Sequence, residues 1–116
     1  MAAVARVIDQ PALEVVIDTE HLSRMTLGEL SLQREVLALF DRQADILLPR
    51  IRRGQPSVAS ASVHTLKGSA TGIGAFKVAR AAEAVEQAQD AAAAAAIDTL
   101  AAVLEEAKAE IARLLK

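Results

Sequence analysis

Residues 57 to 72 read S-V-A-S-A-S-V-H-T-L-K-G-S-A-T-G, and the spacing of their apolar residues predicts a helix. At about 100° per residue, one sector of roughly 100° holds His64, Lys67, Gly68 and Thr71. The opposite side would face a core, and its apolar residues are Ala59, Val63, Leu66, Ala70 and Ile73. We therefore expect the histidine to point at solvent, with a lysine one turn on and a glycine beside it.

The residues around His64 exclude some of the roles that a histidine can have. A metal site would need a second His or Cys three or four residues away, and the sequence has none there, so no metal ligands are predicted. A general base usually has a carboxylate to orient it, and none lies within one helical turn. An exposed imidazole is nucleophilic near neutral pH, and Lys67 would neutralise a phosphoryl group attached to it. Gly68 lacks a Cβ atom, which leaves room for another protein. On these residues alone, an ordinary solvated histidine remains the alternative.

The same stretch resembles the active-site signature of histidine-containing phosphotransfer (HPt) domains, His-x-x-Lys-Gly followed by small residues. The match is His64, Lys67 and Gly68, followed by Ser69 and Ala70. Two upstream runs, residues 22–28 and 33–40, look like the helix that precedes the active-site helix in that family. The similarity covers most of residues 18 to 115.

The resemblance implies a phosphocarrier of two-component signalling, not an autonomous kinase. His64 would accept a phosphoryl group from a phospho-aspartate of a response-regulator receiver domain and pass it to another receiver. Lys67 would stabilise the phosphate charge, and Gly68 would permit close approach. A sensor histidine kinase, often a hybrid one, is the further partner that the resemblance implies. No cofactor is expected on this chain, since Mg²⁺ would be carried by the partner receiver.

Four further residues are candidates for partner docking: Thr65, Thr71, Lys77 and Arg80. For Lys77 and Arg80, solvated surface charges are the favoured alternative. Gln87 is a conceivable hydrogen-bond donor near His64, by analogy with family members that carry a glutamine on the following helix.

Composition favours one all-α domain. The chain has 116 residues, of which 53% are hydrophobic but only 2% aromatic, and its many alanines and leucines favour helix. A net charge of −2 gives no electrostatic footprint for nucleic acid. The chain has no cysteine, and no stretch has the apolar length of a signal peptide or a membrane span. We therefore expect a cytoplasmic monomer that does not associate with a membrane.

The expected fold is an antiparallel four-helix bundle over residues 18–116, with a short extra N-terminal helix, preceded by an arm of residues 1–17. Asp18 is the predicted N-cap of the short helix over residues 19–27, and His21 is expected to be a surface residue. A long helix should follow from residue 29 to 52, with Pro49 kinking or ending it early. Its apolar residues form a seam and a second strip, so it should lie between two partners. The seam comprises Leu30, Leu37, Phe40, Ala44, Leu47 and Ile51, and the strip comprises Leu32, Val36, Leu39 and Ile46.

Three more helices complete the predicted bundle. The active-site helix is expected over residues 57–72 with Ser57 as its cap, and the next helix over residues 76–89. Residues 90–96 are read as the turn into a last helix. That helix has an apolar repeat at spacings of three and four: Ile97, Leu100, Leu104, Ala107, Ile111 and Leu114.

Other functions remain open on the sequence alone. The chain would also fit a non-catalytic bundle that binds receivers, or the phosphotransfer domain of a chemotaxis-type kinase that phosphorylates the histidine directly. The donor, the acceptor, the direction of phosphate flow and the signal relayed are not encoded in any motif.

Overall fold

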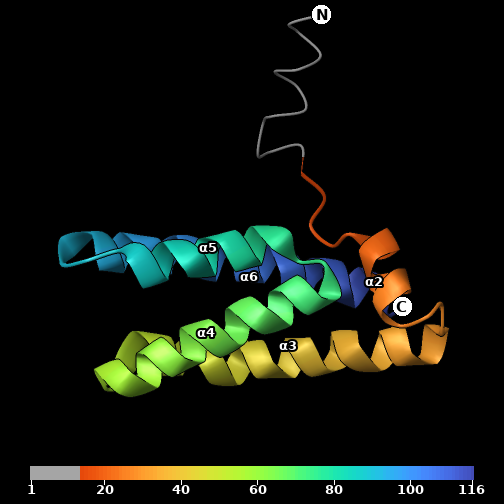
Figure 1. The fold of residues 1–116 in the computed structure, drawn as a ribbon, viewed down its shortest axis with the longest axis horizontal. Helices are drawn as coiled ribbons and strands as arrows, with labels where there is room; N and C mark the ends of the chain where they lie inside the picture. Colours follow the sequence, from red (N-terminus) through yellow and green to blue (C-terminus); the bar gives the residue numbers. More distant parts are fainter. Residues whose placement is uncertain (1–13) are drawn as a thin grey trace, which may run out of the picture.

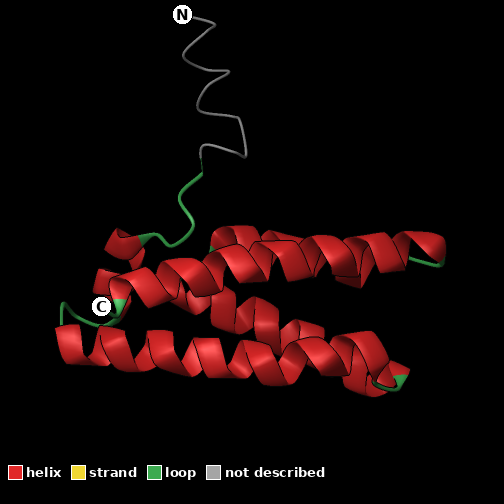
Figure 2. Ribbon diagram, turned by 180° about the vertical axis from the view of Figure 1, so that it is seen from behind, coloured by secondary structure: helices red, strands yellow, loops and turns green. Residues whose placement is uncertain are grey.

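The computed structural model describes residues 14–116, which form five α-helices and no β-strand. The helices are α2 (Thr19–Met25), α3 (Leu30–Arg53), α4 (Pro56–Ile73), α5 (Phe76–Gln87) and α6 (Ala91–Leu114). Each of the four longer helices runs antiparallel to the one before it, and the first, α3, also packs against the last, α6 (Figure 1). The short helix α2 packs on α4 and α3 at one end of the bundle (Figure 2). The predicted all-α bundle with a short N-terminal helix is therefore confirmed.

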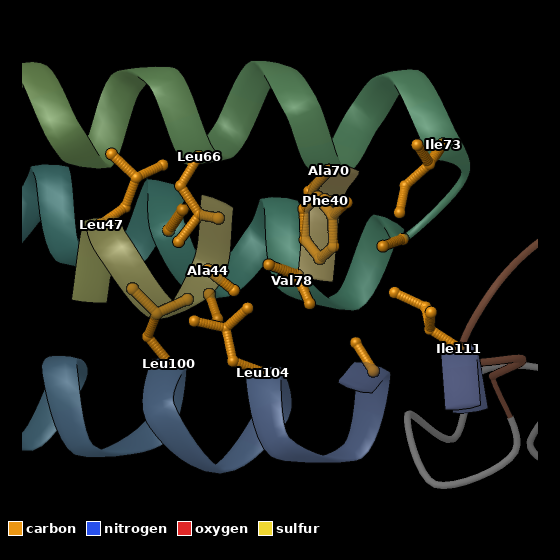
Figure 3. Packing of buried hydrophobic residues seen from close by; sticks show 14 of the residues in the cluster. Phe40, Ala44, Leu47, Leu66, Ala70, Ile73, Val78, Leu100, Leu104 and Ile111 are labelled. Carbon is orange, nitrogen blue, oxygen red and sulfur yellow. The ribbon is translucent and has the colours of Figure 1, made fainter. Parts of the chain in front are cut away.

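The core forms from one apolar stripe of each long helix, as the spacing predicts. Figure 3 shows Phe40, Leu66, Val78 and Leu104 meeting between the helices, and each of these side chains is at most 1% exposed. Burying such a side chain stabilises the fold by about 1.5–3 kcal/mol. Most of the predicted arm lies outside the described residues, but Ile17, at its end, is part of this core.

Helix α3 differs from its prediction in two ways. The seam is buried from Leu37 to Ile51, but Leu30 is 73% exposed because it begins the helix at the end of the bundle. Helix α3 packs against both α4 and α6, as predicted, but most of its second strip is not buried by them. Of its residues, Val36 is partly buried, whereas Leu32, Leu39 and Ile46, the outer strip of α3, are exposed.

The early end predicted at Pro49 is wrong, because α3 continues to Arg53. A proline inside a helix costs about 3 kcal/mol. The buried side chains of Leu47 and Ile51 lie on either side of it, and each contributes about 1.5–3 kcal/mol. Their burial offsets the lost backbone hydrogen bond, so the helix persists.

Several other helix boundaries differ from the predicted ones for local reasons. Helix α2 ends at Met25 instead of Leu27, because Leu27 has a positive φ of 54°. Helix α5 ends at Gln87, two residues earlier than expected. Residues 91–96 belong to α6 and not to a turn, since alanine has the highest helix propensity.

Both ends of α4 are set by residues outside the expected range. Ser57 is not its cap: Gln55 is the N-cap and Pro56 the first helical residue, where a missing N–H costs nothing. Gly74 ends the helix with a φ of 84°, and an added Cβ there would lie 2.7 Å from the Asp18 carbonyl oxygen.

The N-cap of helix α2 is hydrogen-bonded to the C-terminal end of α4. The Asp18 N–H donates a hydrogen bond of 2.9 Å to the Gly74 carbonyl oxygen. The Asp18 carboxylate accepts one of 3.0 Å from the His21 N–H, which confirms the predicted N-cap. The His21 ring is half-buried at the edge of Phe76, with centroids 5.1 Å apart, so its prediction as a plain surface residue is wrong.

Candidate functional site

His64 lies on the outer face of α4, as its helical position predicts. Its side chain is 78% exposed, whereas Leu66 and Ala70 on the opposite face are fully buried. The same helix therefore anchors the core on one side and presents the imidazole to solvent on the other.

A carboxylate from the neighbouring helix contacts both reactive side chains. Glu86, in the last turn of α5, places Oε2 3.6 Å from His64 Nδ1. Its Oε1 accepts a hydrogen bond of 2.7 Å from Lys67 Nζ. The carboxylate that α4 lacks within one turn of His64 is thus supplied by α5.

This contact bears on the position of the histidine proton. An ionised carboxylate only accepts hydrogen bonds, so it favours a proton on the nitrogen that faces it. That nitrogen is Nδ1, and the lone pair of His64 is then on Nε2. At 3.6 Å the contact is longer than a hydrogen bond, so it orients the ring without locking it.

Both members of the ion pair between Lys67 and Glu86 are charged at neutral pH. The hydrogen bond to Glu86 raises the pKa of Lys67 above its ordinary value of 10.5, and desolvation opposes this only in part. The hydrogen bond from Lys67 lowers the pKa of Glu86 below 4.5, and the nearby imidazole adds to the effect. Lys67 is therefore a cation and Glu86 an anion next to His64.

Gly68 leaves the surface beside His64 uncovered. A Cβ atom added at Gly68 would meet no atom of the chain within 4 Å, and the same holds for Gly72. Each helix-interior glycine costs about 0.5–1 kcal/mol relative to alanine. Since internal packing does not require either glycine, the free space is available to a second molecule.

A family model for the Hpt domain matches residues 23–112 of the chain. The chain belongs to the histidine-containing phosphotransfer domain family. A solved structure similar to this Hpt domain is that of the histidine phosphotransferase ShpA from Caulobacter crescentus. The identity is 29%, the TM-score is 0.71, and the match covers 86% of this chain and 90% of ShpA. No curated protein gives a significant match.

The predicted docking residues of this Hpt domain separate into two groups. Thr65 is exposed and lines a shallow groove between α3 and α4, together with Arg50 and Val58. Thr71 is also exposed on α4, but its hydroxyl donates a hydrogen bond of 2.9 Å to the Lys67 carbonyl oxygen. Both residues therefore share the surface of His64.

Lys77 and Arg80 are not brought to the histidine. Lys77 Nζ lies 2.8 Å from Glu106 Oε1 on α6, and the Arg80 guanidinium pairs with Glu14. Lys77 is in the first turn of α5, and Glu86 lies nine positions further on, about 14 Å along a helix axis. These two cations lie along a different part of the bundle.

Glu86 is the site residue that the sequence reading missed. Gln87, its neighbour, is exposed, and the described residues show no hydrogen bond between it and His64. A signal for Glu86 does exist: in an antiparallel helical hairpin, residues equally far from the turn lie opposite each other. With the turn at Gly74 and Ala75, the residue opposite His64 falls at position 85 or 86.

Among residues 14–116, no three His, Cys, Asp or Glu side chains are grouped so that they would hold a metal ion. Within the same residues, no helix combines the length and apolar character needed to cross a membrane.

Proposed function

We propose that this Hpt domain is a phosphocarrier of a multistep phosphorelay. It accepts a phosphoryl group on His64 from a receiver-domain phospho-aspartate and delivers it to the aspartate of another receiver. The observation that carries this proposal is the His64 side chain, which is 78% exposed, has Nδ1 3.6 Å from Glu86 Oε2, and lies one helical turn from the uncovered Gly68.

The transfer requires no proton movement on this chain. The Nε2 lone pair of His64 attacks phosphorus, an Nε2–P bond forms, and the P–O bond of the acyl phosphate breaks. The electron pair of that bond leaves with the donor aspartate as a carboxylate. The proton stays on Nδ1, where Glu86 faces the positive charge that develops on the ring. The second transfer is the reverse reaction with another aspartate, and each receiver would supply its own Mg²⁺.

Lys67 is a cation on the same face of α4 as His64. It lies one helical turn from His64 on α4, and its Nζ is held by Glu86. A lysine ammonium is a compact charge on a flexible stem, so it can turn from the carboxylate to a phosphoryl oxygen. We assign it the stabilisation of the phosphoryl charge.

The receiver would dock on the side of α4 that faces α3. This α3–α4 face combines the outer strip of α3 with small residues of α4, namely the exposed Thr65 and Gly68 and the half-buried Gly72. Leu32, the first residue of this strip, lines an apolar groove together with Gly72 of α4. Apolar surface that internal packing leaves uncovered typically marks an interaction site.

The remaining parts of the proposal concern partners and setting. A hybrid sensor kinase would feed phosphate to the first receiver, and the domain would act as a monomer in the cytoplasm. Size-exclusion chromatography with light scattering tests the monomer, and a dimer at micromolar concentration would contradict it.

The experiment that tests the function is phosphate transfer from a panel of phosphorylated receiver domains. The wild type should take up an acid-labile, base-stable label, as a phosphoramidate does, and His64→Gln should take up none. His21→Gln is the matched control, because it removes the other histidine and leaves the site intact. Label on His64→Gln, or an unlabelled wild type with every donor, would contradict the proposal.

A further inference from the structure

Glu86 plays two opposing parts at this site. In the unphosphorylated structure it holds Lys67 at 2.7 Å and faces Nδ1 of His64 at 3.6 Å. Its side chain is 27% exposed, so the carboxylate lies partly sheltered between the two basic groups. Both contacts are favourable as long as His64 carries no phosphate.

Phosphorylation reverses the electrostatic balance. A phosphoryl group brings about two negative charges at neutral pH. Even with the proton retained on Nδ1, the modified ring gains net negative charge beside an ionised carboxylate, and like charges this close repel. The attraction between Glu86 and the protonated Nδ1 offsets only part of this repulsion.

After phosphorylation, two anions compete for Lys67: the Glu86 carboxylate and the phosphoryl group. Its Nζ already forms a short charge-assisted hydrogen bond to Glu86 Oε1, and a phosphoryl group on the adjacent turn must share it or displace the carboxylate. Either outcome weakens the neutralisation of the phosphoryl group. A glutamine at the same position would keep an oxygen that can face Nδ1–H, but it would carry no charge to compete with the phosphoryl group.

We propose that Glu86 is a resident counterion that competes with the phosphoryl group for Lys67, so that phosphorylated His64 is kept in a destabilised, readily transferred state. This inference rests on the proposed phosphocarrier function. It assigns to Glu86 the role of tuning how long the phosphoryl group stays.

The test measures the lifetime of the phosphorylated protein without any receiver. Phosphoramidate charges the protein: Nε2 attacks phosphorus, the P–N bond of the reagent breaks, and ammonia leaves. Decay is then followed by ³¹P nuclear magnetic resonance after the reagent is removed. In the decay, water attacks phosphorus, the Nε2–P bond breaks with its electron pair returning to Nε2, and dihydrogen phosphate is released.

Glu86→Gln should lengthen the half-life of the phosphohistidine roughly 1.5- to 5-fold, the range typical of an exposed ionic interaction. Glu83→Gln is the matched control: it removes a carboxylate of the same helix that influences Lys67 only through space, and its effect should be smaller. An unchanged or shorter half-life in Glu86→Gln would overturn the inference.

A double-mutant cycle between Glu86 and Lys67 tests the competition itself. In a Lys67→Ala background, Glu86→Gln should have at most half of its effect, because the contested cation is gone. An equal effect in both backgrounds would refute the competition. If the wild type takes no phosphoryl group from phosphoramidate, the proposed function fails together with the inference, whereas normal charging with no effect of Glu86→Gln overturns the inference alone.

Discussion

Gly68→Ala should make the protein more stable. Gly68 lies inside α4, and an added Cβ would meet no atom within 4 Å, so the substitution introduces no clash. Alanine is preferred over glycine in a helix interior by about 0.8–1 kcal/mol. For a domain near 100 residues, about 1 kcal/mol raises the melting temperature by roughly 4–8 °C. Urea denaturation and thermal melts followed by circular dichroism measure both quantities.

The same substitution at the end of α4 should act in the opposite direction. Gly74 has a φ of 84°, and its Cβ would lie 2.7 Å from the Asp18 carbonyl oxygen. Left-handed backbone costs a non-glycine residue roughly 1–2 kcal/mol before the clash is counted, so Gly74→Ala should destabilise the protein. The two variants form a matched pair, because each adds one methyl group to the same helix.

The stability gain at Gly68 should come with a loss of function for larger side chains. Gly68→Gln should keep helicity but slow transfer from a receiver, because the added side chain fills the space left for docking. The reasoning is refuted if Gly68→Ala is no more stable than the wild type, or if Gly68→Gln transfers phosphate at the wild-type rate.

Three further perturbations test the fold and the ion pair. Phe40→Ala should lower the free energy of unfolding by about 3–5 kcal/mol, because Phe40 is 1% exposed at the centre of the core. Urea denaturation measures this free energy, and a loss below about 1 kcal/mol would contradict the prediction. Asp18→Ala removes the N-cap of α2 and should cost about 0.5–2 kcal/mol in the same assay, whereas an unchanged midpoint would show that the cap is dispensable. The pKa of Glu86 is lowered from 4.5 by its hydrogen bond from Lys67, so its contribution to stability is full above pH 4.5 and is lost as pH falls through the lower folded value. Urea midpoints at neutral and acidic pH should therefore differ more for the wild type than for Glu86→Gln, and equal differences would rule out this linkage.

The fold could be predicted because burial periodicity dominates it. The seam of α6 is buried from Leu100 to Ile111 at spacings of three and four, as its sequence requires. The outer strip of α3 was misplaced because apolar spacing alone does not tell a helix-facing strip from an uncovered one. Leu39 and Ile46 have the residue types of a core but lie on the flank that no helix of the described chain covers.

The site was only partly predictable for a related reason. His64, Lys67 and Gly68 are adjacent in sequence, so helical angles suffice to bring them together. Glu86 comes from another helix, and its contact depends on the register between α4 and α5, which the cap at Gly74 sets. Lys77 and Arg80 were candidates for the site from their helix alone, with solvated surface charges as the favoured alternative, and each pairs with a carboxylate elsewhere.

The most direct test of the account is to find which atom carries the phosphoryl group. Protein labelled with ¹⁵N at its histidines should be charged with phosphoramidate, and the ring nitrogen bonded to phosphorus identified by nuclear magnetic resonance. The account predicts one phosphorylated nitrogen, Nε2 of His64, because Nδ1 faces Glu86. Phosphate on Nδ1 of His64, phosphate on His21, or no phosphohistidine in the folded protein would contradict it.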